Sequence, residues 1–159
     1  MTLDHQHFMD LALDLAKKAG DEGNRPIGSI LVDARGHVVA RGANRMYSEY
    51  DPTAHAEMIV IRDACRKLKA VELTGFTIYS TLEPCPMCCW AIIDSKISRL
   101  VLGGRYAGLG RRDVGRYSIE NFLEFTGKSL ELVTGIRTTE GEELRRGWQL
   151  KRDAGAGPN

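Results

Sequence analysis

The sequence lacks any long apolar run. No stretch approaches the roughly 18 apolar residues needed to span a bilayer, so we expect no membrane helix and no membrane partner. The first ten residues, MTLDHQHFMD, also lack the basic-then-apolar pattern of a secretory signal peptide. Together these absences predict a soluble protein of the cytoplasm.

An excess of charge of either sign is also missing. The 22 Lys and Arg residues nearly balance the 21 Asp and Glu residues, for a net charge of +1, so no global field attracts a polyanion. One local exception is the segment 96–116, with six basic residues against one aspartate. It could contact phosphate in a nucleotide or in RNA. Alternatively, the six glutamates of residues 120–143 could neutralise it.

Cysteine is scarce and unevenly placed. Of the four cysteines, Cys85, Cys88 and Cys89 fall within five positions, and only Cys65 lies elsewhere. A disulfide framework would spread its cysteines along the chain. The clustering therefore favours a reducing compartment and indicates metal binding or catalysis.

A chain of 159 residues is about one domain in length, and we expect a single domain over residues 1–152 with a disordered tail at 153–159. Apolar periodicity predicts helices and β-rich runs predict strands. The expected helices are 3–19, 55–69, 85–95, 118–126 and 139–151, the last opened by a capping box of Thr139 and Glu142. The expected strands are 27–32, 38–43, 76–81, 97–102 and 130–134.

This order of elements predicts an α/β fold. Strands separated by helices favour right-handed crossovers and parallel neighbours, and the hairpin formed by residues 27–43 supplies an antiparallel edge. We therefore expect a three-layer α/β/α domain with a mixed, mostly parallel five-stranded sheet. Ligands of such sheets collect at the carboxyl ends of the strands.

Two short motifs lie at predicted helix starts. In the Pro84–Cys88 stretch, PCPMC, the two sulfurs three residues apart share one helix face near its positive N-terminus. His55 opens a different helix. One nitrogen and two sulfurs suit zinc and leave a fourth position for water, as in catalytic zinc sites. A structural zinc site would need a fourth protein ligand, for which Cys89, about 100° further around the helix, is poorly placed.

Glu57 follows His55 by two residues. In the first turn of a helix both side chains can reach past the helix end, so Glu57 can approach the metal's open position. Two thiolates offset the charge of zinc and leave its water less acidified, and a nearby carboxylate base compensates for this. The alternative is that Glu57 is only a favourable charge at a helix start.

These motifs resemble those of the zinc-dependent nucleobase and nucleoside deaminases with a cytidine deaminase-like fold. The similar strings are PIGSILVD, GAN, DPTAHAE and TLEPCPMC, and the branch is the one that holds guanine deaminases, fungal cytosine deaminase and bacterial tRNA adenosine deaminases. The resemblance implies a hydrolase with one zinc per subunit, ligated by His55, Cys85 and Cys88. It also implies that Glu57 is the catalytic proton shuttle. The substrate-binding residues that it implies are Ile27, Asn44, Ala56, Glu83, Pro84 and Trp148.

The substrate prediction depends on where the chain departs from this branch. Bacterial tRNA adenosine deaminases carry a stretch like G-A-R-D-x-K-x-G-A-x-G, whereas this chain has GGRYAGLGRRDVG at 103–115. We therefore expect a small-molecule substrate, a free cytosine- or guanine-like nucleobase or nucleoside, and a homodimer formed around the zinc-bearing helices. The alternative is adenosine-to-inosine editing of tRNA. Two non-catalytic alternatives are a structural zinc module and a nucleotide-binding regulatory module.

Overall fold

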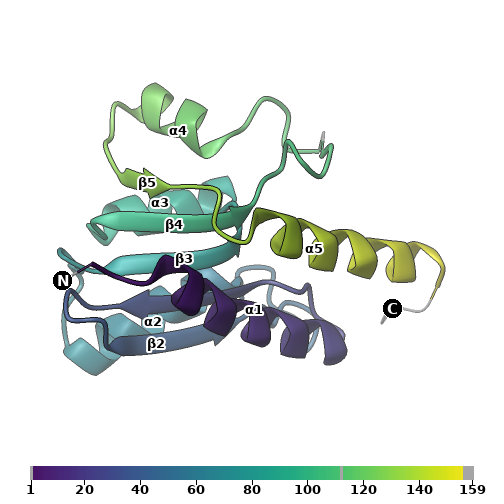
Figure 1. The fold of residues 1–159 in the computed structure, drawn as a ribbon, viewed down its shortest axis with the longest axis horizontal. Coiled ribbons are helices and arrows are strands. Elements are labelled where there is room, and N and C mark those ends of the chain that lie inside the picture. Colours follow the sequence, from purple (N-terminus) through teal and green to yellow (C-terminus); the bar gives the residue numbers. More distant parts are fainter. Residues whose placement is uncertain (1, 112, 156–159) are drawn as a thin grey trace.

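The computed structural model describes residues 2–111 and 113–155, and it shows a five-stranded sheet between two helical layers (Figure 1). The α/β/α fold predicted from the sequence is confirmed, and each element lies within two residues of its predicted bounds. In chain order the elements are α1 (His5–Asp21), β1 (Gly28–Val32), β2 (Val38–Ala43), α2 (Ala56–Leu68), β3 (Thr77–Leu82), α3 (Pro86–Asp94), β4 (Arg99–Gly104), α4 (Ile119–Thr126), β5 (Glu131–Val133) and α5 (Thr138–Asp153).

The sheet has the order β2-β1-β3-β4-β5. β1 is antiparallel to both β2 and β3, whereas β3–β4 and β4–β5 are parallel pairs. Four strands therefore point the same way and only β1 is reversed. The hairpin of β1 and β2 lies at one edge of the sheet, as predicted. Its strand β2 is the edge strand, and β1 pairs with β3. As a result, two of the four pairings are antiparallel.

Both faces of the sheet are covered, α1 and α5 lying on one side and α2 and α3 on the other (Figure 1). Side chains alternate between two cores along each central strand. On β1, Ile30 and Val32 join the core under α1 while Leu31 joins the core under α2 and α3; on β3, Tyr79 and Ile78 divide in the same way. Burial on both faces explains why these strands are continuous apolar runs in the sequence.

The start of α5 differs from the prediction. Thr139 does not cap this helix, because the helix begins at Thr138 and its N-cap residue is Arg137, which makes no side-chain capping bond. The other member of the predicted capping box, Glu142, instead accepts a hydrogen bond from the Arg105 backbone N–H at 3.0 Å. The contact with Arg105 therefore uses the carboxylate that the capping box would have used.

Helix α5 ends at Asp153, next to the predicted domain boundary at residue 152. Residues 156–159 of the predicted disordered tail lie outside the described residues. Among the helices that the structure describes, none has the length and apolarity required to cross a membrane.

A glycine lets α2 approach the sheet closely. A Cβ atom on Gly42 of β2 would lie 2.6 Å from the Ala56 carbonyl oxygen and 2.8 Å from Val60 Cγ2. Such distances are well inside van der Waals contact, so any side chain there would push away the start of α2, which holds His55 and Glu57.

We predict that Gly42→Ala lowers the free energy of unfolding by about 1–3 kcal/mol, because overpacking against a backbone atom forces a shift. Urea denaturation measures the change. The matched control is Gly147→Ala in α5, where a Cβ meets no atom within 4 Å, and which should gain up to about 1 kcal/mol of helix stability. Equal effects of the two substitutions would contradict the close-approach argument.

Candidate metal centre and active site

Two helix N-termini meet at one edge of the sheet. β2 and β3 point the same way, since each is antiparallel to β1, and the chain passes from their carboxyl ends into α2 and α3. His55 is the N-cap residue of α2 and Cys85 is the N-cap residue of α3, and neither uses its side chain for capping. Pro86 at the first helical position favours this helix start. The fold thus leaves both side chains free to bind something else.

The three predicted metal ligands lie together. His55 Nδ1 is 3.5 Å from both Cys85 Sγ and Cys88 Sγ, and the three donor atoms lie within 4.8 Å of one another. Tetrahedral zinc, with bonds of about 2.0–2.3 Å, separates its ligands by roughly 3.5 Å, so these residues fit zinc. In residues 2–111 and 113–155 no fourth His, Cys, Asp or Glu joins the group, which leaves one coordination position for substrate or water.

The electrostatics of the two sulfurs also favour a cation. A hydrogen bond from Cys88 lowers the pKa of Cys85 to about 4, aided by His55. The same bond, together with burial, raises the pKa of Cys88. The pair therefore holds one negative charge by itself, and a dication at this point would favour both thiolates.

Glu57 lies against this group and is almost completely buried, with 3% of its surface exposed. Its Oε1 accepts a hydrogen bond from Ser80 Oγ at 2.9 Å. Burial, followed by the negative charge of Cys85, raises the pKa of Glu57. A carboxylate that is held in place and readily protonated is suited to move protons.

The predicted substrate residues Asn44 and Ile27 lie at the edge of the sheet where β2 ends and β1 begins, and Ala56 follows His55 directly. The Asn44 backbone N–H donates to the Ile27 carbonyl oxygen at 3.0 Å, and Asn44 Oδ1 accepts from the Met46 N–H at 3.1 Å. Asn44 Nδ2 is buried without a partner among the described residues, so it is available to a ligand. Ala56 is fully buried between the two reactive residues of α2.

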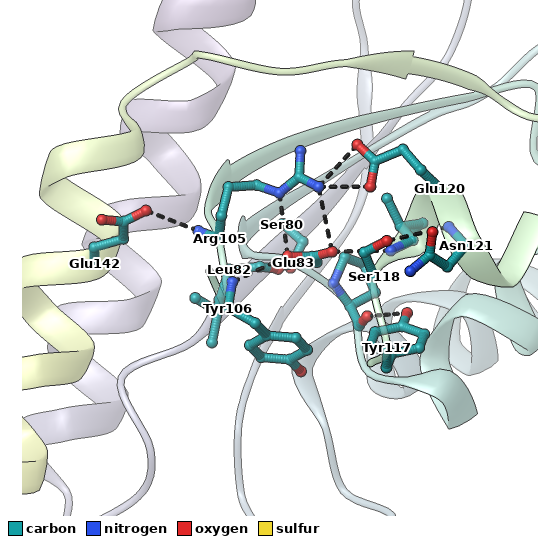
Figure 2. Close-up of polar contacts among 12 residues, drawn as sticks. Ser80, Leu82, Glu83, Arg105, Tyr106, Tyr117, Ser118, Glu120, Asn121 and Glu142 are labelled. Carbon is teal, nitrogen blue, oxygen red and sulfur yellow. Dashed lines mark hydrogen bonds and ion pairs between the residues drawn. The ribbon is translucent and has the colours of Figure 1, made fainter. Parts of the chain in front are cut away.

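Glu83 organises the loop beyond the metal helix (Figure 2). Its buried carboxylate accepts hydrogen bonds from Arg105 Nε at 3.1 Å, Tyr106 N at 3.0 Å and Ile119 N at 2.9 Å. Arg105 also pairs with Glu120, at 2.6 Å between Nη2 and Oε2. Both ends of the segment 105–119 are therefore tied to the residue two positions before Cys85. The predicted contact of the Glu83 backbone with substrate stays a prediction.

Pro84 and Trp148 occupy different parts of the surroundings. The Pro84 carbonyl oxygen accepts a hydrogen bond from Tyr117 Oη at 2.5 Å, which further ties the loop to the metal helix. Trp148 lies on α5 and contacts the ring of Tyr47, with 6.0 Å between centroids. Tyr47 belongs to the loop that follows Asn44.

Sequence reasoning missed Ser80, Tyr47 and the residues that Glu83 gathers. Ser80 had a usable signal, since it is a polar residue within the buried run of β3, immediately before the TLEPC motif. The contacts of Tyr106 and Tyr117 had none, because only the folded loop brings them to Glu83 and Pro84.

The basic segment 96–116 is largely neutralised internally. Arg105 pairs with Glu83 and Glu120, Arg99 pairs with Glu131 at 2.9 Å, and Lys96 and Arg111 pair with Glu72 and Asp113. Arg112 lies outside the described residues. Ion pairs therefore neutralise most of this charge among the described residues, but only Glu120 and Glu131 come from the predicted stretch 120–143, and Glu72, Glu83 and Asp113 supply the other carboxylates.

The fold and the site define a zinc-dependent hydrolytic deaminase: a His and two Cys donors at two helix starts, with a buried carboxylate beside them and one position open. The family model of the cytidine and deoxycytidylate deaminase zinc-binding region matches residues 2–104. The chain belongs to this family, as the resemblance implied, and zinc is its cofactor.

The chain is similar to several characterised deaminases. A tRNA-specific adenosine deaminase of Agrobacterium fabrum is 47% identical over 145 residues, covering 88% of this chain and 90% of that protein. A structure from a study of A-to-I editing by tRNA:A34 deaminases at the wobble position is 34% identical with a TM-score of 0.70, covering 87% and 98% of the two chains. A guanine deaminase from Nitrosomonas europaea has a TM-score of 0.81 at 23% identity, covering 94% and 87%, which shows the shared fold.

These relatives overturn one prediction. The expectation of a free cytosine- or guanine-like substrate is wrong, because the highly identical relatives are tRNA-specific adenosine deaminases. That expectation depended on residues 103–115, whose sequence differs from the corresponding stretch of bacterial tRNA adenosine deaminases. The family model ends at residue 104, whereas the similarity to the tRNA enzymes extends over nearly the whole chain.

We predict that Cys88→Ala abolishes stoichiometric zinc binding, because two donors remain where zinc requires at least three. Metal analysis of the purified protein should fall from about one zinc per chain to below about 0.1. The control is Cys65→Ala, a partly buried free cysteine outside the donor group, which should keep its zinc. Retention of zinc by the Cys88 variant would refute the assigned ligand set.

We predict that Glu83→Gln costs on the order of 3 kcal/mol of stability, because it removes the charge from a buried ion pair. It should also speed amide hydrogen exchange at Tyr106 and Ile119. The control is Glu120→Gln, whose exposed pair with Arg105 should contribute less than about 1 kcal/mol. If both variants behave alike, Glu83 does not organise the loop.

Proposed function

We propose that this protein deaminates adenosine to inosine within tRNA. The observation that carries the proposal is the 47% identity to a tRNA-specific adenosine deaminase over about nine-tenths of both chains. The site is consistent with it, since adenine presents an exocyclic amine on a ring carbon, the group that a hydrolytic deaminase removes.

The geometry supports a division of labour. His55, Cys85 and Cys88 would hold zinc, which when bound acts as a Lewis acid and lowers the pKa of water. Glu57 takes the proton of the attacking water and gives it to the ring nitrogen beside the carbon under attack. It then takes the remaining proton of the added hydroxyl and passes it to the amine; the C–N bond breaks, ammonia leaves and a carbonyl replaces the amine, so one water is consumed. Ser80 keeps the Glu57 carboxylate in place.

The remaining predicted residues would receive the nucleotide. Asn44 Nδ2, which has no partner among the described residues, is a donor for the purine ring, while Ile27, Ala56, Pro84 and the Glu83 backbone supply the wall around it. Trp148 and its neighbour Tyr47, over which the guanidinium groups of Arg145 and Arg152 lie, would form an aromatic and cationic wall for an unstacked base, since proteins commonly hold single-stranded RNA loops by stacking on such groups. A tRNA anticodon loop is such a substrate.

We also propose a cytoplasmic homodimer. The four cysteines are free, and thiolate ligands persist in a reducing compartment. On the surface, Trp90 of α3 is 44% exposed and Phe125 of α4 is 88% exposed, and such apolar side chains gain by being covered. Ile92, on the same helix as Trp90, is fully buried in the core and does not belong to this surface. Light scattering at micromolar concentration tests the dimer.

We predict that Glu57→Gln yields a folded, zinc-loaded protein whose rate of inosine formation in tRNA falls by at least about 10²-fold, because the proton carrier is lost. Sequencing of the treated tRNA, in which inosine reads as guanosine, measures the product. The unmodified protein should act on tRNA and leave free guanine and cytosine unchanged. Ammonia release from a free base, with none from tRNA, would reject the proposal.

A further inference from the structure

One arginine outside the catalytic group is buried with little compensation. Arg145 of α5 is only 8% exposed. Its Nη1 donates to Gln149 Oε1 at 2.9 Å, and its guanidinium lies over the Trp148 ring, 4.9 Å from the centroid. Its Nε is buried and has no partner in the described part of the chain. A buried cation held by an amide and an aromatic face normally requires an anion.

The charged groups nearest to Arg145 are mostly positive, which increases its requirement for an anion. Burial, and then the positive charges of Arg111 and Arg25, lower the pKa of Arg145 to about 10. Arg25 adds a second buried Nε without a partner among the described residues. The carboxylate that acts on Arg145 in the opposite direction is Asp113, which is 63% exposed and pairs with Arg111. Among the described residues, three guanidinium groups here face one exposed carboxylate and the Cys85 thiolate, whose charge acts on Arg111, so a local excess of positive charge remains.

The three arginines are close to the catalytic group, since the charge of Arg25 acts on His55 and that of Arg111 interacts with Cys85. Arg25 immediately precedes Pro26 and Ile27, the segment bonded to Asn44. Arg111 lies over the ring of Tyr106, 4.8 Å from the centroid, and Tyr106 donates its backbone N–H to Glu83. Arg152 extends the positive surface along α5, its guanidinium 4.4 Å from the Tyr47 centroid and 5.3 Å from that of Trp148. Arginines interleaved with aromatic rings form the surface that a nucleotide strand prefers.

We propose that Arg25, Arg111 and Arg145 form a phosphate-binding subsite beside the catalytic group. This assignment rests on the proposed function: the subsite would bind the backbone phosphate that flanks the target adenosine. Guanidinium forks match phosphate oxygens, and a dianionic or monoanionic phosphate would complete the charge balance of the trio. The same chemistry would accept the 5′-phosphate of a free nucleotide, so the experiment must separate the two sources.

The test measures binding to zinc-loaded Glu57→Gln protein, which holds its substrate without converting it. The probes are an anticodon stem-loop RNA, the same RNA with a neutral methylphosphonate beside the target adenosine, adenosine and adenosine monophosphate. Arg145→Gln should weaken binding of the charged stem-loop about ten- to hundred-fold, the usual effect of one charge-assisted contact. It should change binding of the methylphosphonate RNA little, because that RNA lacks the charge that Arg145 meets.

The matched control is Lys151→Gln, which removes an exposed charge from the same helix and should change binding less than about threefold. A second variant, Asp113→Asn, removes the carboxylate that competes for Arg111 and should tighten binding of the charged RNA. A folding defect cannot produce that gain. Zinc content and thermal unfolding of each variant confirm that the fold is kept.

The outcomes separate the two proposals. An equal loss for both RNAs, or an equal loss in the Lys151 variant, overturns the subsite. If adenosine monophosphate binds at least about tenfold better than adenosine, if only Arg145→Gln removes that preference, and if the methylphosphonate does not weaken RNA binding, the phosphate comes from a free nucleotide. If, in addition, the unmodified protein forms no inosine in tRNA, then the subsite stands and the proposed function fails. If inosine forms in tRNA without any phosphate discrimination, the proposed function stands and the subsite fails.

Discussion

The reversed strand β1 is the constraint on which the active site depends. Because β1 is antiparallel to both of its neighbours, β2 and β3 end at the same edge of the sheet. The helices that follow them therefore begin side by side, with His55 and Cys85 as N-cap residues. The positive ends of both helices then act on one small volume, which favours the thiolate at Cys85. The donor group is a consequence of topology, and the motif residues need only occupy the first turns.

A second layer of interactions keeps that edge rigid. Glu83 lies between the end of β3 and the first metal-binding cysteine, and its carboxylate fastens both ends of the segment 105–119. Tyr117 adds a bond to the carbonyl oxygen of Pro84. On the other side, the missing Cβ of Gly42 lets the start of α2 lie directly on β2. A catalytic group assembled from two chain segments keeps its spacing only if each segment is held in this way.

The sequence predicts much of this, for reasons that differ between elements. The central strands are buried on both faces, so their apolar runs are unambiguous, and the metal ligands sit at short spacings on helix starts that local rules predict. Local rules fail where a distant group competes: Glu142 leaves its capping box to bind Arg105, and Glu83 turns its carboxylate to a loop 22 to 36 residues away.

The charge of the molecule shows the same limit. Counted along the chain, the basic residues gather at 96–116, and that segment attracts attention as a contact for phosphate. In the folded protein most of those charges meet carboxylates. Arg145 and the Nε of Arg25, which stand outside that basic segment, are buried with little to neutralise them, and the charges of Arg25 and Arg111 act on Arg145. Charge density in sequence and charge excess in space are different quantities, because folding pairs opposite charges wherever the surface allows. The arginines that lack a carboxylate partner in the folded protein therefore indicate a ligand site better than the basic segment 96–116 does.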